Sequence, residues 1–472
     1  MAQLAIFRVL SDSSYSNVFG YSVQSEFDTN GGVMKRVVCA CIIGLLVSVV
    51  GTPARADEVT DWNQTMLRAG LIAGNTPTVM SRVAALVQSA VFDAVNGINP
   101  RYTPVFVTPA GPPDASRRAA AVQAAYAILS RLYGSSPANA QQVAFDARRM
   151  VSLAAIAADE SGSSIASGIT WGQSVADAIW TWRSTDGFSV TAPFPDDLTL
   201  GNWRRTPNLP VSGALSAAGA GYLQFSTQTP WVMTSPMQFR PPAPPSLASA
   251  QYARDFNETK MMGAFASAAR TPDQTTYSLF WNSASAAYLW NTLAVALIEK
   301  NNKDRARADD WSHGVRSNLL ENARILASVD VAMADATIGC WDAKYTYHYW
   351  RPITAIRDTN DDGNGATSPD TGFVPLFATP GHPEYPSGHS CVSGAAAEVL
   401  AAEFGASTHF SMQSDLMIGV VRSYGSFSDA LEEVKNARIF SGIHFRTATE
   451  VGTELGASVA DYVLSQRFQR IN

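Results

Sequence analysis

The stretch Tyr385-Pro386-Ser387-Gly388-His389-Ser390 combines residue types that can bind an anion and move a proton. The small residues Ser387 and Gly388 leave the backbone accessible, and the apolar stretch over 391–404 predicts a buried helix. Backbone N–H groups at the start of a helix point outward and favour an anion. With His389 beside these groups, the stretch predicts an oxyanion site that contains an acid/base side chain.

A second segment, residues 344–352, contributes two cations in an aromatic setting. Lys344 and Arg351 are nearly two helical turns apart, so a helix would place both on one face, together with His348. Pro352 disfavours continuation of this helix and would leave Arg351 free at its end. The surrounding tyrosines and tryptophan favour a buried anion site over a solvated charged face.

A third segment, near the end of the chain, places Arg438 before His444. Gly442 can end the helix that carries Arg438, and a new helix is expected over about 449–467. His444 then falls at a junction between two helices, where a single histidine is more often a satisfied core residue. Whether His444 belongs to a functional site therefore depends on the other two segments.

Together the three segments provide three cations, the Ser387-Gly388 backbone and two histidines. Three positive charges beside helix-start N–H groups suit a tetrahedral oxyanion with two or three negative charges. The two histidines can serve as nucleophile and as acid/base. Because order, residue type and spacing agree at three places, the combination is far more specific than any one segment.

These residues resemble the signature of the superfamily of vanadium-dependent haloperoxidases and type-2 phosphatidic acid phosphatases. That signature is Lys, six residues and Arg-Pro, then Pro-Ser-Gly-His, then Ser-Arg, five residues and His. Its parts stand here as Lys344…Arg351-Pro352, Pro386-Ser387-Gly388-His389 and Ala437-Arg438…His444. The segments 92–96, 280–281 and 444–448 are similar to the soluble bacterial haloperoxidase-like branch, and the likeness spans about residues 57–467.

The resemblance implies a helical-bundle fold and a role for each signature residue. The oxygens of the oxyanion would be bound by Lys344, Arg351, Ser387, Gly388 and Arg438. His444 would be the vanadium ligand in a haloperoxidase, or the nucleophile that forms a phosphohistidine in a phosphatase. His389 would be the acid/base, and Lys344 would also polarise bound peroxide.

Three functions are left open. The first is an exported vanadate-dependent haloperoxidase that oxidises a halide with hydrogen peroxide. The second is a metal-free acid phosphatase acting on phosphomonoesters, and the third is a non-catalytic oxyanion-binding protein. The two histidines disfavour the third function, because binding alone needs only cations and amides. Thr447 and Ala448 stand where phosphatases often carry an Asp that orients the second histidine, which disfavours phosphatase chemistry unless Glu450 or a backbone carbonyl substitutes.

Other positions carry weaker signals. Ala437 replaces the usual Ser of the signature and removes one hydroxyl from the site. His348 and His382 are candidates for residues behind the primary site. Asp93, near the end of an apolar helix, is expected to make a structural hydrogen bond.

Length and composition are those of a globular protein with a large core: 472 residues, 46% hydrophobic and 16% charged. The net charge of −6 and the lack of a basic stripe in the sequence argue against a nucleic-acid partner. The expected partners are small molecules, either hydrogen peroxide and halide or a phosphate ester. Large helical surfaces are compatible with a homodimer.

Residues 1–56 are predicted to be an N-terminal extension and a secretory signal. A basic start at Met34-Lys35-Arg36, an apolar run over 37–50 and Ala54-Arg55-Ala56 form the usual order of such a signal. The run is shorter than the roughly 20 residues of a membrane span. We therefore expect a soluble protein exported to the periplasm or beyond, with an uncleaved anchor as the alternative and Met34 as a second candidate start.

Over 57–472 we expect a single all-α domain whose active-site half covers about 330–467. Separate helices are predicted over about 309–327 and 331–350. The segment 188–246 is rich in proline yet carries many aromatic residues, so it is predicted to be an ordered wrapping segment that contributes a pocket wall. Cys340 and Cys391 remain after signal removal, either as a disulfide or as two buried thiols.

Overall fold

The structure is a computed structural model that describes residues 57–135, 140–190, 192, 194–215, 221–307 and 319–471, without the side chains of 305–307. The predicted extension and signal over 1–56 lie outside these ranges. Within them, thirteen α-helices are joined by loops, one 3-10 helix and a hairpin of β1 (Phe410–Gln413) and β2 (Val421–Tyr424). The predicted all-α fold is confirmed.

Five helices form the first half of the described chain: α2 (Glu58–Ile72), α3 (Pro77–Ile98), α4 (Arg117–Tyr133), α5 (Gln142–Ile156) and α6 (Gly162–Arg183). Helix α3 is buried along almost its whole length because α4, α6 and the later helix α10 all pack against it. By length and composition α3 could cross a membrane, but 94% of its apolar stretch is buried inside the protein. It therefore serves as a core helix here.

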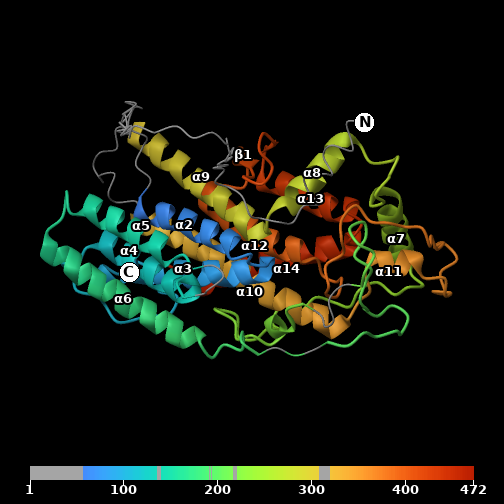
Figure 1. Cartoon of the computed structure of the whole chain (residues 1–472), viewed down its shortest axis with the longest axis horizontal. Helices are drawn as coiled ribbons and strands as arrows, with labels where there is room; N and C mark the ends of the chain where they lie inside the picture. Colours follow the sequence, from blue (N-terminus) through green and yellow to red (C-terminus); the bar gives the residue numbers. More distant parts are fainter. Residues whose placement is uncertain are drawn as a thin grey trace, which may run out of the picture. The chain divides into compact units, whose positions relative to one another are not determined.

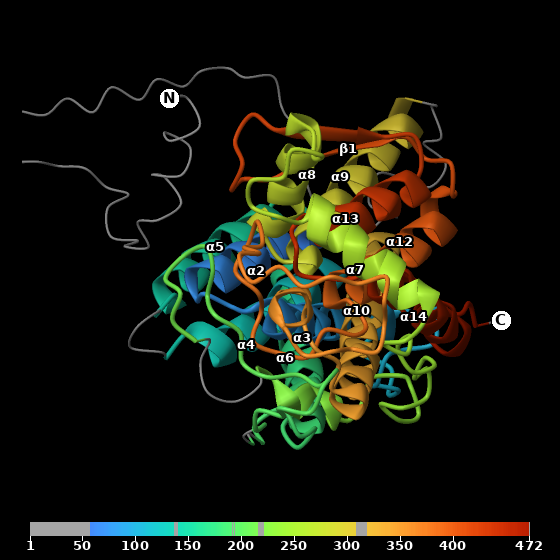
Figure 2. The same ribbon diagram turned by 90° about the vertical axis from the view of Figure 1, so that its right-hand side faces the viewer.

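The second half contains α7 (Ala250–Met262), α8 (Pro272–Ser283), α9 (Ala286–Arg307), α10 (Leu319–Tyr347), α11 (Pro352–Arg357), α12 (Gly388–Phe404), α13 (Phe427–Phe440) and α14 (Arg446–Gln466). Helix α10 runs through the middle and packs against α3, α12 and α14 (Figure 1). Helix α13 packs against both α7 and α8 (Figure 2).

Helix α10 corrects two expectations about its own extent. The predicted break between 327 and 331 is wrong, because residues 328–330 are fully buried and continue the helix without Gly or Pro. The other end also differs: α10 ends at Tyr347, and His348 has the left-handed φ of 51°. Arg351 is the N-cap of α11, so Pro352 begins a new helix and Arg351 shares no helical face with Lys344.

Helices α12 and α14 approach each other at backbone contact distance because glycines line their interface. A Cβ on Gly456 would lie 2.1 Å from the carbonyl oxygen of Cys391, and one on Gly452 would lie 2.8 Å from that of Ser387. The backbone N–H of Ser387 also donates a hydrogen bond of 2.9 Å to the Ala448 carbonyl. These contacts fix the start of α12 against the start of α14.

The proline-rich segment is held to the helices at its aromatic residues. Its described parts contain one short helix, the 3-10 helix η1 (Leu223–Ser226), while Trp203 and Trp231 are buried in the core. Asp335 of α10 accepts hydrogen bonds from the backbone N–H groups of residues 231–233. Asp93 of α3 does the same for residues 105–107. The described parts of the segment confirm the wrapping role, and the structural role of Asp93 is confirmed.

Cys340 and Cys391 form a disulfide that joins α10 to α12, with their Cα atoms 6.3 Å apart. Of the two states that the sequence left open, the structure contains the bridge. Because Lys344 follows Cys340 by one helical turn and His389 lies just before Cys391, the disulfide links the two helices that carry these side chains.

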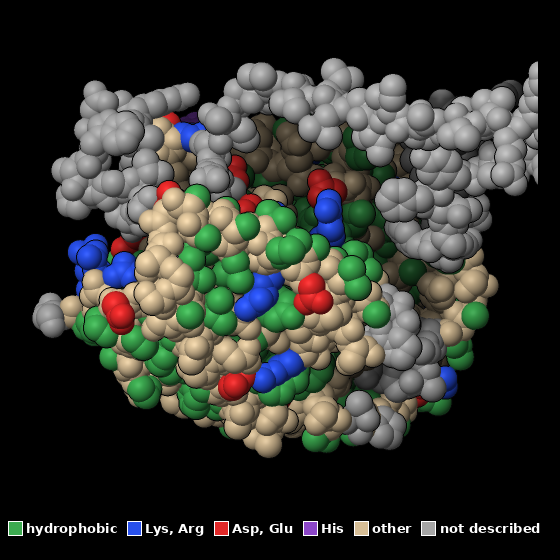
Figure 3. Space-filling view, turned by 60° about the vertical axis from the view of Figure 1, so that its left-hand side comes forward, with side chains coloured by type: hydrophobic (Ala, Val, Ile, Leu, Met, Phe, Trp, Pro, Cys, Tyr) green, Lys and Arg blue, Asp and Glu red, His purple; other side chains and the backbone are tan. Residues whose placement is uncertain are grey.

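Charged side chains are dispersed over the described face shown in Figure 3. Lys and Arg side chains are interspersed with Asp, Glu and hydrophobic side chains, and they form no continuous stripe there. This arrangement agrees with the acidic net charge of −6. The described part of this face therefore lacks the electrostatic pattern of a nucleic-acid site.

Candidate active site

The three signature segments converge on one place in the fold. Lys344 lies in the last turn of α10, Arg351 caps α11, and Arg438 lies in the last turn of α13. Ser387 caps α12 and precedes Gly388 and His389 in its first turn, while His444 occupies the turn between α13 and α14. Four helix ends thus bring together residues that lie up to 100 positions apart in the sequence.

His444 is oriented by Glu384, a residue that the sequence reasoning missed. His444 Nδ1 lies 2.8 Å from Glu384 Oε1, and the Phe445 N–H donates to the same oxygen at 3.0 Å. Since that oxygen is an acceptor, Nδ1 carries the proton and donates it. The suggested orienter Glu450 is exposed instead, so the expectation for that residue is wrong. The one signal in the sequence was the position of this Glu directly before Tyr385-Pro386.

The second nitrogen of His444 faces the site. Arg351 Nη1 lies 3.2 Å from His444 Nε2 and also donates to the Ile443 carbonyl oxygen at 2.9 Å. A guanidinium group only donates, so Nε2 presents its lone pair. A fixed neutral tautomer with a lone pair turned into a site is what a metal ligand or a nucleophile needs.

His382 completes the surroundings of Arg351. Arg351 Nε donates to the His382 carbonyl oxygen at 2.8 Å, and Arg351 Nη2 lies 3.0 Å from His382 Nδ1. The imidazole of His382 also packs against Trp341, with ring centroids 5.1 Å apart. The structure thus brings His382 to the site, in contact with a signature cation.

Lys344 is directed at the backbone that leads into α12. Its Nζ donates to the carbonyl oxygens of Pro383 and Glu384 at 2.9 Å each and to that of Pro386. An ammonium group has three N–H donors, and these three acceptors use all of them. Lys344 therefore holds the 383–386 segment in place and adds a positive charge beneath it; its expected contact with an oxyanion stays a prediction.

The start of α12 presents polar atoms that lack partners. Ser387 makes no side-chain capping bond, and among the described residues its buried Oγ has no hydrogen-bond partner. The same holds for His389 Nε2 and for Arg438 Nε within the described part of the chain. Arg438 Nη1 contacts Asn282 Oδ1 at 3.3 Å. Buried polar groups are nearly always satisfied, so this group of unpartnered atoms indicates a ligand site.

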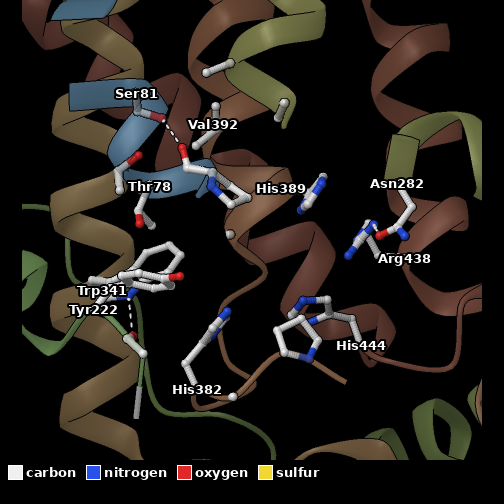
Figure 4. A pocket seen from close by; sticks show the side chains of 18 residues that line it. Thr78, Ser81, Tyr222, Asn282, Trp341, His382, His389, Val392, Arg438 and His444 are labelled. Carbon is white, nitrogen blue, oxygen red and sulfur yellow. Dashed lines mark hydrogen bonds between the residues drawn. The ribbon is translucent and has the colours of Figure 1, made fainter. Parts of the chain in front are cut away.

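These atoms surround a cavity of about 430 Å³. Its chemically active lining is formed by His382, Gly388, His389, Arg438 and His444, while Lys344, Arg351 and Ser387 lie behind it and are fully buried. Figure 4 shows His382, His389, His444 and Arg438 around a common space, with Tyr222 and Trp341 opposite Arg438 and His382 next to Trp341. The predicted pocket wall from the proline-rich segment is Gly221-Tyr222.

The site has an excess of buried positive charge. Burial, and next the neighbouring Arg351, lowers the pKa of Lys344 well below its ordinary value. Burial also lowers the pKa of Arg351 to about 10 and that of Arg438 to about 9. Glu384 is a buried carboxylate whose charge acts on Arg351 and Lys344, and burial raises its pKa to about 7 against the pull of these two cations. An oxyanion would relieve the repulsion between the cations.

The three histidines are neutral for the same reasons. Burial is the main cause that lowers the pKa of His444 and His382 well below the ordinary value, and Arg351 adds to it in both. For His389 the second cause is Arg438, opposed by a hydrogen bond to the Trp281 backbone. A neutral imidazole can accept a proton, which the acid/base role of His389 requires.

Two other predicted positions lie outside the cavity lining. The ring of His348 packs edge-on against Phe194, with centroids 4.8 Å apart, and the structure does not bring it to the cavity. Ala437 is fully buried in α13 behind Arg438. His348 lies outside the cavity because α10 ends at Tyr347, so the chain turns away from the helical face that carries Lys344.

The residues present fit a tetrahedral oxyanion such as vanadate or phosphate. His444 Nε2 supplies one nitrogen ligand, and the unpartnered Ser387 Oγ, the Arg438 Nε–H and the helix-start N–H of Gly388 supply hydrogen-bond donors for oxygens. A Cβ at Gly388 would lie 3.1 Å from the Trp341 ring, so glycine keeps this approach open. These hydrogen-bond donors and the nearby positive charges suit the negative charge of such an oxyanion.

Comparison with known proteins supports the family resemblance that the three motifs indicated. Residues 324–472 match the family model described as the VCPO second helical-bundle domain. The vanadium chloroperoxidase of Curvularia inaequalis is 29% identical over 196 residues, which are 38% of this chain and 30% of that protein. The chain thus spans about a third of the length of that curated relative.

Two solved structures share the fold. One is the first bacterial vanadium-dependent iodoperoxidase, with a TM-score of 0.71 and 24% identity over 89% of this chain and 99% of that one. The other is a holo-type bacterial vanadium-dependent chloroperoxidase, with a TM-score of 0.66 and 17% identity over 87% and 97%. The resemblance indicated by the three motifs is confirmed, and the fold is that of vanadium haloperoxidases.

Proposed function

We propose that this chain, with the fold of vanadium haloperoxidases, is an exported vanadate-dependent haloperoxidase that oxidises a halide with hydrogen peroxide. The observation that carries the proposal is the Glu384–His444 pair, which keeps the proton on Nδ1 and leaves the lone pair on Nε2, beside Arg351 and in a cavity region with unpartnered donors on Ser387 and Arg438. The relatives above, which are vanadium haloperoxidases by name, support the same chemistry.

In this proposal the bound vanadate would supply a Lewis-acid centre at which peroxide is made reactive toward halide. The protein would hold the group with His444 Nε2 and neutralise its oxygens with Arg351, Arg438, the Ser387 hydroxyl and the Gly388 N–H. Neutral His389, whose Nε2 faces the cavity, would accept a proton from incoming peroxide and return it to the product. Lys344 would keep the 383–386 segment in register and add charge beneath the site.

The test is bromination of a phenolic dye by the purified protein. Activity should require vanadate, peroxide and bromide together, and it should fall at least about 100-fold in His389→Ala. The His444→Ala variant should lose vanadate binding as well as activity. Vanadate-loaded protein that folds but produces no oxidised halogen would refute the proposal.

Assays of the same purified sample distinguish the two alternative functions, a phosphatase and a non-catalytic binder. Glu384 removes the sequence-based objection to a phosphatase, since it orients His444 as a nucleophile requires. Hydrolysis of an aryl phosphate without halide oxidation would therefore select the metal-free phosphatase. A protein that binds vanadate and phosphate but performs neither reaction, with unchanged binding in His389→Ala, would be the non-catalytic binder.

Export and domain organisation belong to the same proposal. The Cys340–Cys391 disulfide supports an oxidising compartment, since such bridges are rare in cytosolic proteins. N-terminal sequencing of the mature protein should begin at Asp57, and a chain that retains residues 37–50 would instead indicate an anchor. We also propose that 57–472 unfolds as one domain, with a single cooperative transition as the expected result.

A further inference from the structure

The cavity is larger than the proposed reactants require. Counting each oxygen or halide as one water-sized group of roughly 30 Å³, a tetrahedral oxyanion, one peroxide and one halide need roughly 200 Å³. The cavity holds about 430 Å³, a size that suits a ring-sized organic ligand. About half of its volume is therefore available to a further reactant.

The part of the cavity away from Arg438 is apolar and aromatic, which halide and peroxide do not need. We call this part the aromatic sector and define it by Tyr222, Trp341, Val392 and Pro77, with Thr78 supplying a hydroxyl. Figure 4 shows Tyr222 and Trp341 together on the side opposite Arg438 and Asn282. Aromatic walls bind planar rings by stacked or edge-to-face contact.

Tyr222 is held in this wall by an unusual backbone. Its φ of 72° and ψ of 32° lie in the left-handed region, which costs free energy for a bulky L-residue. The preceding Gly221 secures the conformation: its N–H donates to the Gly381 carbonyl at 2.7 Å, and its carbonyl accepts from Tyr345 Oη at 2.8 Å. Trp341 Nε1 donates to the same carbonyl at 3.4 Å. Backbone strain that the surroundings enforce is common at functional positions and here motivates a role for Tyr222.

We propose that the aromatic sector binds a planar, electron-rich aromatic acceptor such as a phenol, and that Tyr222 is the specificity-determining residue for it. The inference rests on the proposed function and names its organic substrate class. Halogenation then occurs inside the cavity rather than in solution. Tyr222 and Trp341 contact the ring faces, and the hydroxyls of Tyr222 and Thr78 are available to the hydroxyl of the acceptor.

The reaction balances with the reactants already named. Halide, hydrogen peroxide and one proton give hypohalous acid and water, with the halide oxidised and the O–O bond reduced. The hypohalous acid then transfers its halogen to a ring carbon as the C–halogen bond forms and the O–halogen bond breaks. The ring carbon releases its proton, and hydroxide takes it up as water. A bound ring exposes one edge to this transfer, so its position decides the isomer formed.

The experiment measures the ortho-to-para ratio of bromophenol formed from phenol by the full, vanadate-loaded protein, beside the ratio from hypobromous acid in the same buffer. The wild-type ratio should differ from that of free hypobromous acid. Tyr222→Asn keeps a residue that tolerates the left-handed backbone but removes the ring, and it should return the ratio to the free value. Val392→Phe, which fills the sector, should do the same. Tyr462→Phe, on α14 outside the cavity lining, is the matched control and should keep the wild-type ratio.

A second readout is independent of catalysis. Ligand-observed NMR with vanadate-free protein should detect phenol binding, weakened about three- to tenfold in Tyr222→Asn, as expected for the loss of an aromatic contact. Halide oxidation with the free-solution isomer ratio and no phenol binding would overturn the inference while the proposed function stands. If halide oxidation is absent altogether, the proposed function fails, and phenol binding by wild type against Tyr222→Asn still decides the acceptor site.

Discussion

At the scale of residues, the site is defined by where each polar atom finds its partner. Glu384 and His444 are both almost fully buried, and their hydrogen bond leaves Nε2 as the one basic atom of His444 that faces the cavity. Lys344 uses its donors on backbone carbonyls, so its positive charge acts without a free N–H group. The described site residues with a buried polar atom that lacks a hydrogen-bond partner include Ser387, His389 and Arg438, and Glu384 through its Oε2.

Replacement of Glu384 by Gln tests whether this partner fixes His444. The amide removes the negative charge and can present an N–H to Nδ1, which favours the wrong tautomer or a rotated ring. We expect vanadate affinity to fall about 10- to 100-fold, as is usual when the partner of a metal-binding histidine is lost. Equilibrium dialysis with vanadate measures the change. Glu450→Gln, at an exposed position of α14, is the control and should bind as wild type does; equal affinities in both variants would contradict the role of Glu384.

Asp330 offers a test of buried charge away from the site. Burial raises its pKa to about 8, opposed by the hydrogen bond that Asn291 donates to it. The folded state thus keeps the proton above the ordinary value of 3.8, so the stabilisation is fully present below that pH and is lost as pH rises through about 8. Between pH 7 and pH 9 the free energy of unfolding should fall by about 1 kcal/mol through this group.

The Asp330→Asn variant is neutral at every pH and should not show this fall. Urea unfolding at pH 7 and pH 9 measures it, with the wild type losing more stability than the variant across that interval. A parallel pH dependence in the two proteins would show that Asp330 is already ionised in the folded state at pH 7.

At the scale of elements, helix ends position the chemistry. The starts of α11 and α12 and the ends of α10 and α13 all meet at the cavity, so the site depends on how these helices pack. The close contact between α12 and α14 is the most demanding of these packings, because it brings backbone against backbone at glycines. The segment 188–246 is held by Asp335 and delivers Tyr222 to the same cavity.

Gly456→Ala tests the contact between α12 and α14. The added Cβ would lie 2.1 Å from the Cys391 carbonyl oxygen, so the helices must separate. We expect a loss of about 1–3 kcal/mol in the free energy of unfolding, typical of overpacking, together with weaker vanadate binding as the start of α12 moves. Gly162→Ala, at the open start of α6, is the control and should cause no loss. Unfolding with urea and dialysis with vanadate provide the two readouts, and unchanged values for Gly456→Ala would contradict the packing argument.

At the scale of the whole molecule, the candidate site lies deep among the helices that form the core. Helices α10, α12 and α14 carry or flank the site residues and also supply much of the buried hydrophobic cluster. A ligand that binds only the folded state must therefore stabilise the fold against unfolding. The disulfide between α10 and α12 crosses the same region.

Vanadate should accordingly raise the thermal unfolding midpoint. At a concentration 100 times the dissociation constant the gain is about 2.7 kcal/mol in the free energy of unfolding. Differential scanning calorimetry should show the midpoint rising with vanadate in the wild type and remaining constant in His444→Ala. Phosphate, which has the same shape, should reduce the effect by competition. An equal rise in His444→Ala would place vanadate at another site.

The sequence alone determined the fold class and the signature positions, because they depend on local order, residue type and spacing. Lys344, Arg351, Ser387, Gly388, His389, Arg438 and His444 all follow from three short segments, and the structure brings them together. Helix periodicity also predicted α14 and the apolar α12.

Only the tertiary structure decided which side chains pair across the chain. Glu384 lies 60 residues before His444, and no spacing rule in the sequence relates the two. The packing of α12 against α14 brings them together. The end of α10 at Tyr347 removed His348 from the cavity and moved Arg351 to another helix, because the local turn overrode the helical period. Tyr222 lies at the site because Gly221, the residue before it, forms hydrogen bonds with Gly381, Tyr345 and Trp341. These contacts join segments that are distant in the sequence.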